Sequence, residues 1–396
     1  MILYYDISRQ KSKMKKDSFT SEAIALLRFP LTVFVVFIHY NIAVRGFSLH
    51  GVTYGLDAPG WLRFFANLFS DVLPRTAVPL FYIISGYLLF RDGTFDGGTY
   101  CRKLRSRVGT LLVPYLLWNV IAVLVTLSHS LPFFSSVFPS AHLMEVHLTP
   151  LRLLRTFVDN YWNRGILVSP EWEGIASVEP YPADVPLWYV RDLMLMIFLS
   201  PLIQWLIQRA GWRIVVALGV LWCLRSVLFP MWNEGWGTML LTAAFFFTWG
   251  AACGIWGTDI VERMWRWRAA LLLYPPVAIA DALTKGWDWN TCIHHSGILL
   301  GIIAILCVSS HLVVLGRERA LSMLAGGSFF VLAFHSLVMD DLGKLLFTTL
   351  HLSVTPFTLL LLYLAVPTLT ILFSLATYIA LRHLAPPLCH LLTGGR

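Results

Sequence analysis

Arg28 and His39 are the two residues whose types and spacing first indicate chemistry in this sequence. They lie in a stretch of mostly apolar residues that predicts a membrane-spanning helix, and eleven positions separate them. Because eleven residues make almost three helical turns, both side chains project from nearly the same face, about 16 Å apart along the axis. Ionisable groups at membrane depth are costly and by default mark a functional site. We therefore predict an anion-binding mouth at Arg28 that leads to a proton-handling centre at His39.

Two further motifs combine polar residues with apolar runs, and each has a structural alternative. Ser85 precedes Gly86 in an apolar run, where a Ser-Gly pair is explained more readily by close helix packing than by chemistry. The basic run contains Arg102, Arg105 and Arg107. Such a cluster at a helix entrance would bind phosphates, although composition alone favours a cytoplasmic stop signal or a lipid-headgroup contact.

The last two motifs lie further along the chain. Trp188 opens an apolar run and is followed by the adjacent pair Arg191 and Asp192. That pair fits a mutually satisfied ion pair as well as a part in an acceptor site. His335 follows a Gly-Gly-Ser-Phe-Phe motif in a later apolar run. A lone membrane histidine is more often a hydrogen-bonded packing residue, with catalysis as the second interpretation.

Composition places the chain in the membrane. Of its 396 residues 57% are hydrophobic and 13% are charged, and the mean hydropathy is +0.68, whereas a soluble domain has about 25% charged residues. The predicted fold class is an all-α polytopic membrane protein. The formal net charge of +8 is attributed to cytoplasmic loops rather than to nucleic-acid binding. The six cysteines show no metal or disulfide spacing, so no metal site is predicted.

Ten apolar runs predict about ten transmembrane helices with both termini in the cytoplasm. The runs are 23–43, 75–90, 108–128, 186–206, 213–230, 238–256, 268–283, 293–315, 325–348 and 355–381. With this arrangement the inner segments hold nineteen Lys and Arg residues and the outer segments seven, which is the bias expected of cytoplasmic loops. The predicted organisation is a basic cytoplasmic N-terminus at 1–22, a transmembrane domain at 23–382 and a cytoplasmic tail at 383–396.

The longest predicted non-spanning segment, 129–184, faces outward. It contains six prolines and six acidic residues, together with Tyr161, Trp162 and Trp172. A loop of this length in a compact protein is commonly functional or disordered. Its aromatic and carboxylate side chains favour sugar binding, and a surface cap over the helices is the alternative.

In their order along the chain, these motifs resemble the integral membrane acyltransferase 3 family, which includes O-acetyltransferases of bacterial surface polysaccharides. The resemblance is carried by Arg28-x10-His39, the run ending in Ser-Gly-Tyr, the basic loop with Val-Pro-Tyr-Leu-Leu-Trp, Pro-Leu-Trp-Tyr-Val-Arg-Asp-Leu, and Ser-Phe…His335. It implies a ten-helix core, a cytoplasmic acyl-coenzyme A donor with Arg28 beside it, and a basic cluster at 102–107 near its phosphates. It also implies that His39 is essential for transfer.

Two departures from the family pattern limit what is carried over. Trp188 is followed by Asp192 at four residues, where many relatives have Glu at five, so Asp192 is assigned no catalytic part. Some relatives have a fused extracytoplasmic domain. In this sequence, which stops at Arg396, transfer to the acceptor is expected to be direct or to use a separate partner.

The function expected from the sequence is an O-acyltransferase of the bacterial plasma (inner) membrane. Acyl-coenzyme A is the co-substrate, with acetyl expected and succinyl as the alternative, and no cofactor is permanently bound. His39 acts as the general base on a hydroxyl of a glycan or lipid-linked acceptor. Ser85, His335, Trp188 and Arg191 are predicted supporting residues. The alternatives are a secondary transporter, with Arg28 and His39 as an anion or proton relay, and a non-catalytic lipid- or glycan-binding subunit.

Overall fold

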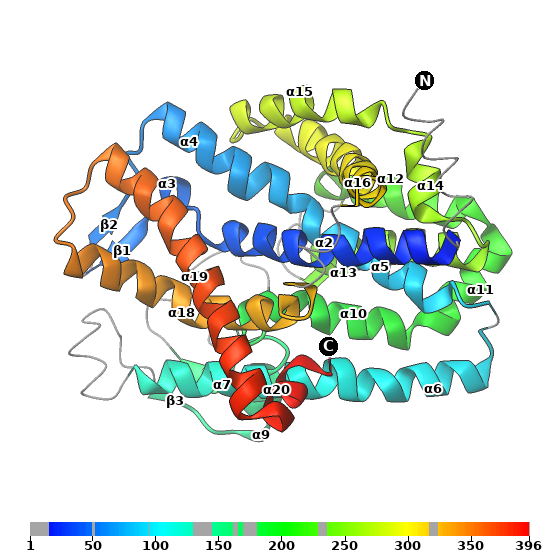
Figure 1. The fold of residues 1–396 in the computed structure, drawn as a ribbon, viewed down its shortest axis with the longest axis horizontal. Coiled ribbons are helices and arrows are strands. Elements are labelled where there is room, and N and C mark those ends of the chain that lie inside the picture. The colour runs from blue at the N-terminus through cyan, green and yellow to red at the C-terminus, as the bar shows by residue number, and fades with distance from the viewer. Residues whose placement is uncertain are drawn as a thin grey trace.

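The structure of this chain is a bundle of long helices, seen in a computed structural model. It describes residues 16–49, 52–93, 95–129, 145–160, 165–168, 180–228, 236–316 and 324–395. Most of the long helices extend along the longest axis of the molecule, with α15 and α16 at one edge and α6, α7 and α20 at the opposite edge (Figure 1). The helices α2, α5, α10 and α18 occupy the layers between these edges.

The helical elements follow one another with short connections. In the first half they are α2 (Lys16–His39), α3 (Ile42–Arg45), α4 (Gly60–Ala66), the π-helix η1 (Asn67–Val72), the 3-10 helix η2 (Leu73–Thr76), α5 (Ala77–Phe90), α6 (Gly97–Arg107), the π-helix η3 (Val108–Leu112), α7 (Val113–Ser128) and α9 (Pro150–Thr156). In the second half they are the 3-10 helix η6 (Val185–Leu187), α10 (Trp188–Phe198), α11 (Ser200–Ala210), α12 (Trp212–Leu228), α13 (Trp236–Ile255), α14 (Ile260–Trp265), α15 (Ala270–Leu283), α16 (Asn290–Val314), α18 (Ser328–Thr349), α19 (Pro356–Leu384) and α20 (Pro386–Thr393).

Every predicted apolar run contains a helix, and among the described residues six helices are long and apolar enough to cross a membrane. These six are Phe19–Val44, Gly60–Phe90, Gly97–Ser128, Gly237–Ile255, Asn290–Val314 and Pro356–Leu384. About twenty apolar residues are needed to cross the hydrocarbon core. The chain is therefore an all-α, multi-pass membrane protein, whereas the full count of ten spans and the side of the termini stay predictions.

The other four predicted runs differ from simple spanning helices. The run 186–206 forms a pair, α10 and α11, bent by 63°. Pro201 at the start of α11 lacks the N–H that would continue the α10 ladder, so the helix breaks there. The helices α12 and α15 have 17 and 14 residues, and α18 has three charged residues in its second half.

Two small antiparallel hairpins interrupt the predicted all-helical pattern. One pairs β1 (Phe47–Leu49) with β2 (Val52–Tyr54), and the other pairs β3 (Glu145–Val146) with β4 (Leu167–Val168). The second hairpin and α9 lie in the segment 129–184, which the sequence analysis treated as one long loop. The aromatic residues Tyr161, Trp162 and Trp172 lie outside the described residues, so their predicted sugar contacts stay predictions.

Glycines hold α5 and α13 in close contact at the centre of the bundle. A Cβ atom at Gly86 would collide with the backbone of Phe247, one at Gly250 with the backbone of Ile83, and one at Gly254 would lie 2.8 Å from the Tyr87 carbonyl oxygen. In a membrane, helices associate through such close packing because lipid is as apolar as the side chains. The packing interpretation of the Ser-Gly motif is thus confirmed for Gly86.

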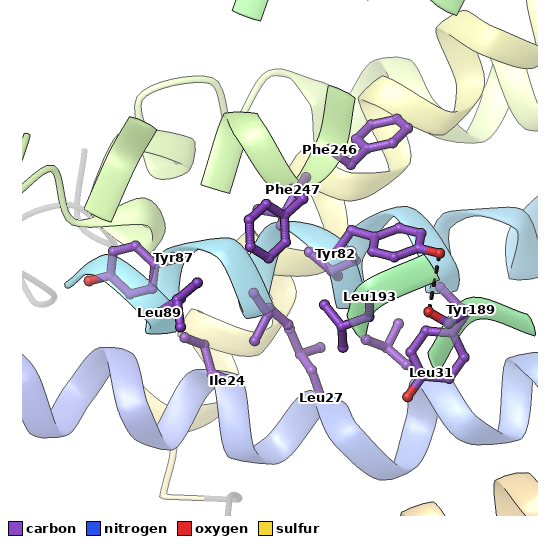
Figure 2. Packing of buried hydrophobic residues seen from close by; sticks show 14 of the residues in the cluster. Ile24, Leu27, Leu31, Tyr82, Tyr87, Leu89, Tyr189, Leu193, Phe246 and Phe247 are labelled. Atoms are coloured by element: carbon purple, nitrogen blue, oxygen red, sulfur yellow. Dashed lines mark hydrogen bonds between the residues drawn. The ribbon is translucent and has the colours of Figure 1, made fainter. Parts of the chain in front are cut away.

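Large apolar side chains fill the space between α2, α5, α10 and α13. Figure 2 shows Leu27 and Leu31 of α2 directed toward Leu193 of α10 and the α5 helix, with Phe247 of α13 on the far side of α5. These side chains are at most 6% exposed. Three of these helices, α2, α5 and α10, border a cavity, called here the main cavity, so this packing fixes part of the walls of the candidate site.

Candidate functional site

Contacts near the start of α2 fix the position of this helix and therefore the position of Arg28. Thr20 donates to the Asp259 carboxylate at 2.8 Å, and Arg91 donates to the Ser21 hydroxyl at 3.0 Å. Downstream, the Thr32 hydroxyl donates to the Arg28 carbonyl oxygen at 2.9 Å. Arg28 itself is exposed although it lies within an apolar helix, because its side chain borders a cavity rather than a neighbouring helix.

The main cavity lies between α2, α5, η3, α10 and the start of α18. Its volume is about 350 Å³. The polar side chains that line it are Arg28, Thr32, Ser85, Arg107, Thr110, Tyr189 and Ser328. No carboxylate is among the described residues that line it. With two guanidinium groups and no acid, the cavity favours a ligand with negative charge.

The π-helix η3 shapes the wall of the main cavity opposite α2. Its residues Thr110 and Leu111 line the cavity, and Arg107 precedes it. A π-helical turn widens the ladder by one residue, and such turns occur frequently at functional sites. Gly394 and Gly395, which follow α20, close the cavity on this side, and α20 is held to α7 by the Trp118 indole N–H, which donates to the Leu392 carbonyl oxygen at 2.9 Å.

Two hydroxyl-bearing residues face the main cavity from other helices. Ser85 of α5 is half-buried, and Gly86 beside it provides the helix contact described above. Ser328, at the start of α18, is 7% exposed, and its hydroxyl has no hydrogen-bond partner in the described part of the chain. A buried hydroxyl without a partner costs stability. Ser328 is therefore a group that a ligand in the cavity would satisfy.

His39 and His335 face each other beyond the main cavity. Their ring centroids are 5.3 Å apart, and the planes are inclined by 50°. Neither histidine lines the cavity: His39 lies seven residues beyond Thr32, about 10 Å along α2, and His335 lies three residues beyond Leu332, about 4.5 Å along α18. The two residues, called here the histidine pair, therefore lie beyond the end of the cavity that Thr32 and Leu332 line.

The hydrogen bonds of His335 define its protonation pattern. The ring is fully buried, and Nδ1 lies 3.1 Å from the Val331 carbonyl oxygen. A carbonyl oxygen only accepts, so Nδ1 carries the proton and Nε2 has the free lone pair of a neutral ring. That Nε2 has no partner within the residues described. His335 is thus a hydrogen-bonded packing residue at Nδ1, as one interpretation of the sequence predicted, while its Nε2 remains available next to His39.

The predicted basic cluster divides between two environments. Arg107 is half-buried and lines the main cavity. Arg102 and Arg105 are exposed on α6, and neither lines the cavity. The Arg102 guanidinium donates to the Thr99 hydroxyl at 3.3 Å. The structure therefore brings Arg28 and Arg107 together and places the other two arginines outside the cavity.

Arg191 and Asp192 form a buried structural pair. The Arg191 Nε donates to the Asp192 carboxylate at 2.8 Å, and Nη1 donates to the carbonyl oxygens of Val158 at 2.7 Å and Pro180 at 3.0 Å. These contacts attach the 129–184 segment to α10. Of the two interpretations left open by the sequence, the ion pair is the one that these contacts favour, and neither residue lines the cavity.

Tyr189 is a site residue that the sequence analysis did not select. It lines the main cavity, while its predicted neighbour Trp188 is half-buried outside it. Tyr189 stacks on Phe81 with ring centroids 5.6 Å apart, and its carbonyl oxygen accepts a hydrogen bond from the Tyr82 hydroxyl at 3.3 Å (Figure 2). The available signal was its position beside Trp188 in the same motif. Adjacent residues of a helix point in different directions, so either of the two could have faced the site.

Comparison with known proteins agrees with this arrangement. Residues 21–379 match the family model described as an acyltransferase domain. The chain is also 30% identical over 392 residues to a protein named succinoglycan biosynthesis protein ExoH, from Rhizobium meliloti strain 1021, covering 96% of this chain and 94% of that protein. No solved structure matches. The matched family model spans nearly the whole bundle and includes Arg28, the histidine pair and the cavity-lining residues other than Gly394 and Gly395. We conclude that this chain belongs to the acyltransferase 3 family.

Proposed function

We propose that this protein transfers an acyl group from cytoplasmic acyl-coenzyme A to a hydroxyl group of a glycan, with His39 as the general base. The observation that carries the proposal is the order of groups along α2. Arg28 enters a cavity that has two guanidinium groups and no carboxylate among its described lining. His39 follows further along the same helix, beyond Thr32 of the cavity lining, and faces His335. An anionic donor and a proton-transfer centre are thus aligned on one helix.

The size of the main cavity suggests how the donor would bind. At about 350 Å³ it lies at the lower end of the range of about 300–1,000 Å³ found for ligand sites. The slender pantetheine thioester would enter it, with its phosphates near Arg28 and Arg107. The nucleotide would remain outside, on the side where α6 presents Arg102 and Arg105. The exposed arginines would then make weaker, solvent-screened contacts.

The transfer step requires one base that also acts as an acid. His39 accepts the proton of the acceptor hydroxyl while the hydroxyl oxygen forms a bond to the thioester carbon. The carbon–sulfur bond then breaks, and the leaving thiolate takes the proton back from His39. The lone pair on His335 Nε2 would stabilise the His39 imidazolium between these two events. His335 is thus proposed as a positioning residue, without contact to the reacting atoms.

The acceptor is proposed from the named relative and from the bundle. The relative is named for succinoglycan biosynthesis, which supports a polysaccharide or its lipid-linked precursor as the acceptor class for this chain. Acetyl is the acyl group we propose, with succinyl as the alternative. In the proposed topology both termini are cytoplasmic, so the acyl group crosses the bacterial plasma membrane between the donor and the acceptor.

Turnover of acyl-coenzyme A by the purified protein tests the proposed activity. Wild-type protein should bind acetyl-coenzyme A in a calorimetric titration and slowly hydrolyse it, since water replaces the missing acceptor. His39→Ala should bind the donor with unchanged affinity and fail to hydrolyse it. Binding without hydrolysis by the wild type, together with release of the intact donor on the opposite side of a vesicle, would instead favour the transporter.

Cysteine labelling tests the proposed orientation separately. Cys101 is exposed near the start of α6, and Asp288 is exposed between α15 and α16. In a background without the other cysteines, Asp288→Cys should react with an impermeant thiol reagent added to intact spheroplasts, whereas Cys101 should not. The opposite labelling pattern would place Arg28 and Arg107 on the side without coenzyme A and would overturn the donor site.

A further inference from the structure

Beyond the histidine pair, a tyrosine hydroxyl is buried against α18. Tyr40 directly follows His39 and is 4% exposed. Its hydroxyl has no hydrogen-bond partner in the described part of the chain. A Cβ atom placed on Gly343 would lie 2.8 Å from that hydroxyl, so the glycine is what allows the tyrosine to approach α18. An unsatisfied buried hydroxyl costs stability, so its presence at this position suggests that a ligand satisfies it.

The turn of α18 beside Tyr40 presents a carboxylate. Asp340 is exposed, lies one turn before Gly343, and acts electrostatically on Tyr40. Around the helix, Gly343 lies between the two functional positions, roughly 80° from His335 and 60° from Asp340. Around the α18 axis, the Tyr40 contact at Gly343 therefore lies between the directions of His335 and Asp340, and along the axis it lies one turn beyond Asp340.

The neighbouring carboxylates already have partners, which sets Asp340 apart. The Asp341 carboxylate lies 2.9 Å from Nε2 of His129. Asp184 is completely buried and accepts a hydrogen bond from the Ser336 hydroxyl at 2.9 Å through Oδ1, while its Oδ2 has no partner in the described part of the chain. Asp340 makes no hydrogen bond or ion pair within the residues described, although the positive charge of Lys344, one turn further along α18, acts on it. One carboxylate on this part of α18 is thus open to a ligand, next to a hydroxyl that lacks a partner.

We propose that Tyr40 and Asp340 form the acceptor subsite, which binds two hydroxyl groups of a neutral sugar residue and presents a third to His39. This proposal rests on the proposed acyl transfer and adds the residues that would bind the acceptor. The Tyr40 hydroxyl bonds one sugar hydroxyl, and the Asp340 carboxylate accepts a hydrogen bond from a neighbouring one. The donor cavity and this subsite then approach the histidine pair from opposite ends of α2.

Three variants separate an acceptor role from a structural one. Tyr40→Phe removes one proposed contact, and Asp340→Asn removes the negative charge that strengthens the other. Tyr274→Phe is the matched control, because the Tyr274 hydroxyl is also buried without a partner in the described part of the chain, and its ring also lies 2.8 Å from a Cβ position, at Gly301. Both Tyr→Phe changes remove an unsatisfied buried hydroxyl, so neither should lower the melting temperature.

The experiment measures two activities of each variant. Acyl groups on surface glycans are quantified by mass spectrometry in cells lacking the endogenous gene that express each variant. Hydrolysis of acetyl-coenzyme A is measured with the purified protein. We expect Tyr40→Phe and Asp340→Asn to reduce glycan acylation at least fivefold with hydrolysis within twofold of wild type. Tyr274→Phe should keep both values within twofold.

Two outcomes would overturn the subsite. Glycan acylation by Tyr40→Phe within twofold of wild type would show that the hydroxyl binds no acceptor. An equal loss of acylation and hydrolysis would assign Tyr40 to the donor reaction or to folding. Failure of the proposed function is a different result, since wild-type protein would then neither hydrolyse acetyl-coenzyme A nor acylate any glycan.

Discussion

Two polar regions inside this bundle contain similar residues but differ in how completely their groups are paired. One surrounds the histidine pair, with Tyr40 and Ser328 nearby. The other, called here the Asp281 cluster, lies at the connection between α15 and α16 and consists of Asp281, Thr284, Lys285, Asn290 and His294. Both place charged or titratable side chains among apolar helices, where such groups are expected to be functional.

In the Asp281 cluster the polar groups satisfy one another. The Asp281 carboxylate, 1% exposed, lies 2.9 Å from the Lys285 ammonium and 2.8 Å from Nδ1 of His294. Asn290 donates to the same carboxylate at 2.9 Å. A network of this kind holds α15 against α16 and leaves no group for a ligand.

Around the histidine pair, in contrast, several buried groups lack partners. His335 Nε2, the Tyr40 hydroxyl and the Ser328 hydroxyl have no hydrogen-bond partner in the described residues. Buried polar groups are normally paired, so each exception requires an explanation. The comparison teaches that charged residues alone do not identify the candidate site, because the Asp281 cluster is charged and internally paired. Unsatisfied atoms also occur elsewhere, as at Tyr274 of α15, so they indicate a site only where they gather around reactive side chains.

The largest expected effect comes from removing the base. His39→Ala should lower acyl transfer by about 10²–10⁴-fold, the range that general acid–base catalysis contributes, without lowering the melting temperature in detergent. A transfer assay and a thermal denaturation curve measure the two quantities. His294→Ala is the control from the paired region, and it should lower the melting temperature while the folded protein keeps its activity. Transfer by His39→Ala within a few fold of wild type would remove the distinction between the two regions.

Asp281→Ala should have the next largest effect, on stability. It leaves Lys285 and His294 without their carboxylate. Breaking a fully buried pair costs about 3–5 kcal/mol, and we expect about 2–3 kcal/mol here because those two side chains are 22% and 21% exposed. Chemical denaturation in detergent measures the loss. A variant as stable as wild type would mean that the cluster does not hold α15 to α16.

The arginines that line the cavity should contribute more to donor affinity than the arginines on the surface of α6. Arg28→Ala and Arg107→Ala should each weaken binding of acetyl-coenzyme A by about 1.5–2 kcal/mol, the lower end for hydrogen bonds to charged groups, because Arg28 is exposed within the cavity. Arg102→Ala and Arg105→Ala should lose less than about 1 kcal/mol as solvent-exposed charges. Calorimetric titration compares the four, and equal losses would contradict the division of the basic cluster.

Ser328→Ala should show the smallest effect. The variant removes a hydroxyl that lacks a partner in the described residues, so the melting temperature should not fall. If a bound donor satisfies the hydroxyl, donor affinity should fall by up to about 1 kcal/mol, the net value of one neutral hydrogen bond. Thr284→Val, in the paired region, should lower stability without changing donor affinity. A Ser328→Ala variant with wild-type affinity would show that the donor does not reach this group.

Most of the fold class was predictable from sequence, because apolar runs of spanning length have few stable alternatives in lipid. The six long spans confirm that part. The bend between α10 and α11 was signalled by Pro201 but was not predicted, and the two hairpins carry no strong local pattern. The exact start of a span was also harder to predict: the helix predicted from 75 begins at Gly60, since η1 and η2 continue its axis through a less regular ladder.

Parts of the candidate site were predictable for the same physical reason, and parts were not. The spacing of Arg28 and His39 placed both on one face of a single helix, which local geometry alone determines. That Arg107, and not Arg102 or Arg105, lines the cavity depends on the direction of α6 and η3 relative to α2. The contact of His39 with His335 joins positions almost 300 residues apart, and no local pattern specifies which distant helices become neighbours.

The sequence by itself determined that this is a helical membrane protein, and it also determined the order of the motifs and the family. These properties follow from composition, periodicity and residue identity. The tertiary structure alone decided which polar groups are satisfied. Asp281 and Arg191 are paired, while His335 Nε2, Tyr40 and Ser328 keep unpaired atoms in the described part of the chain. Pairing is a property of distances between helices, and these are set by close contacts such as those of Gly86 and Gly343 rather than by the residues that react.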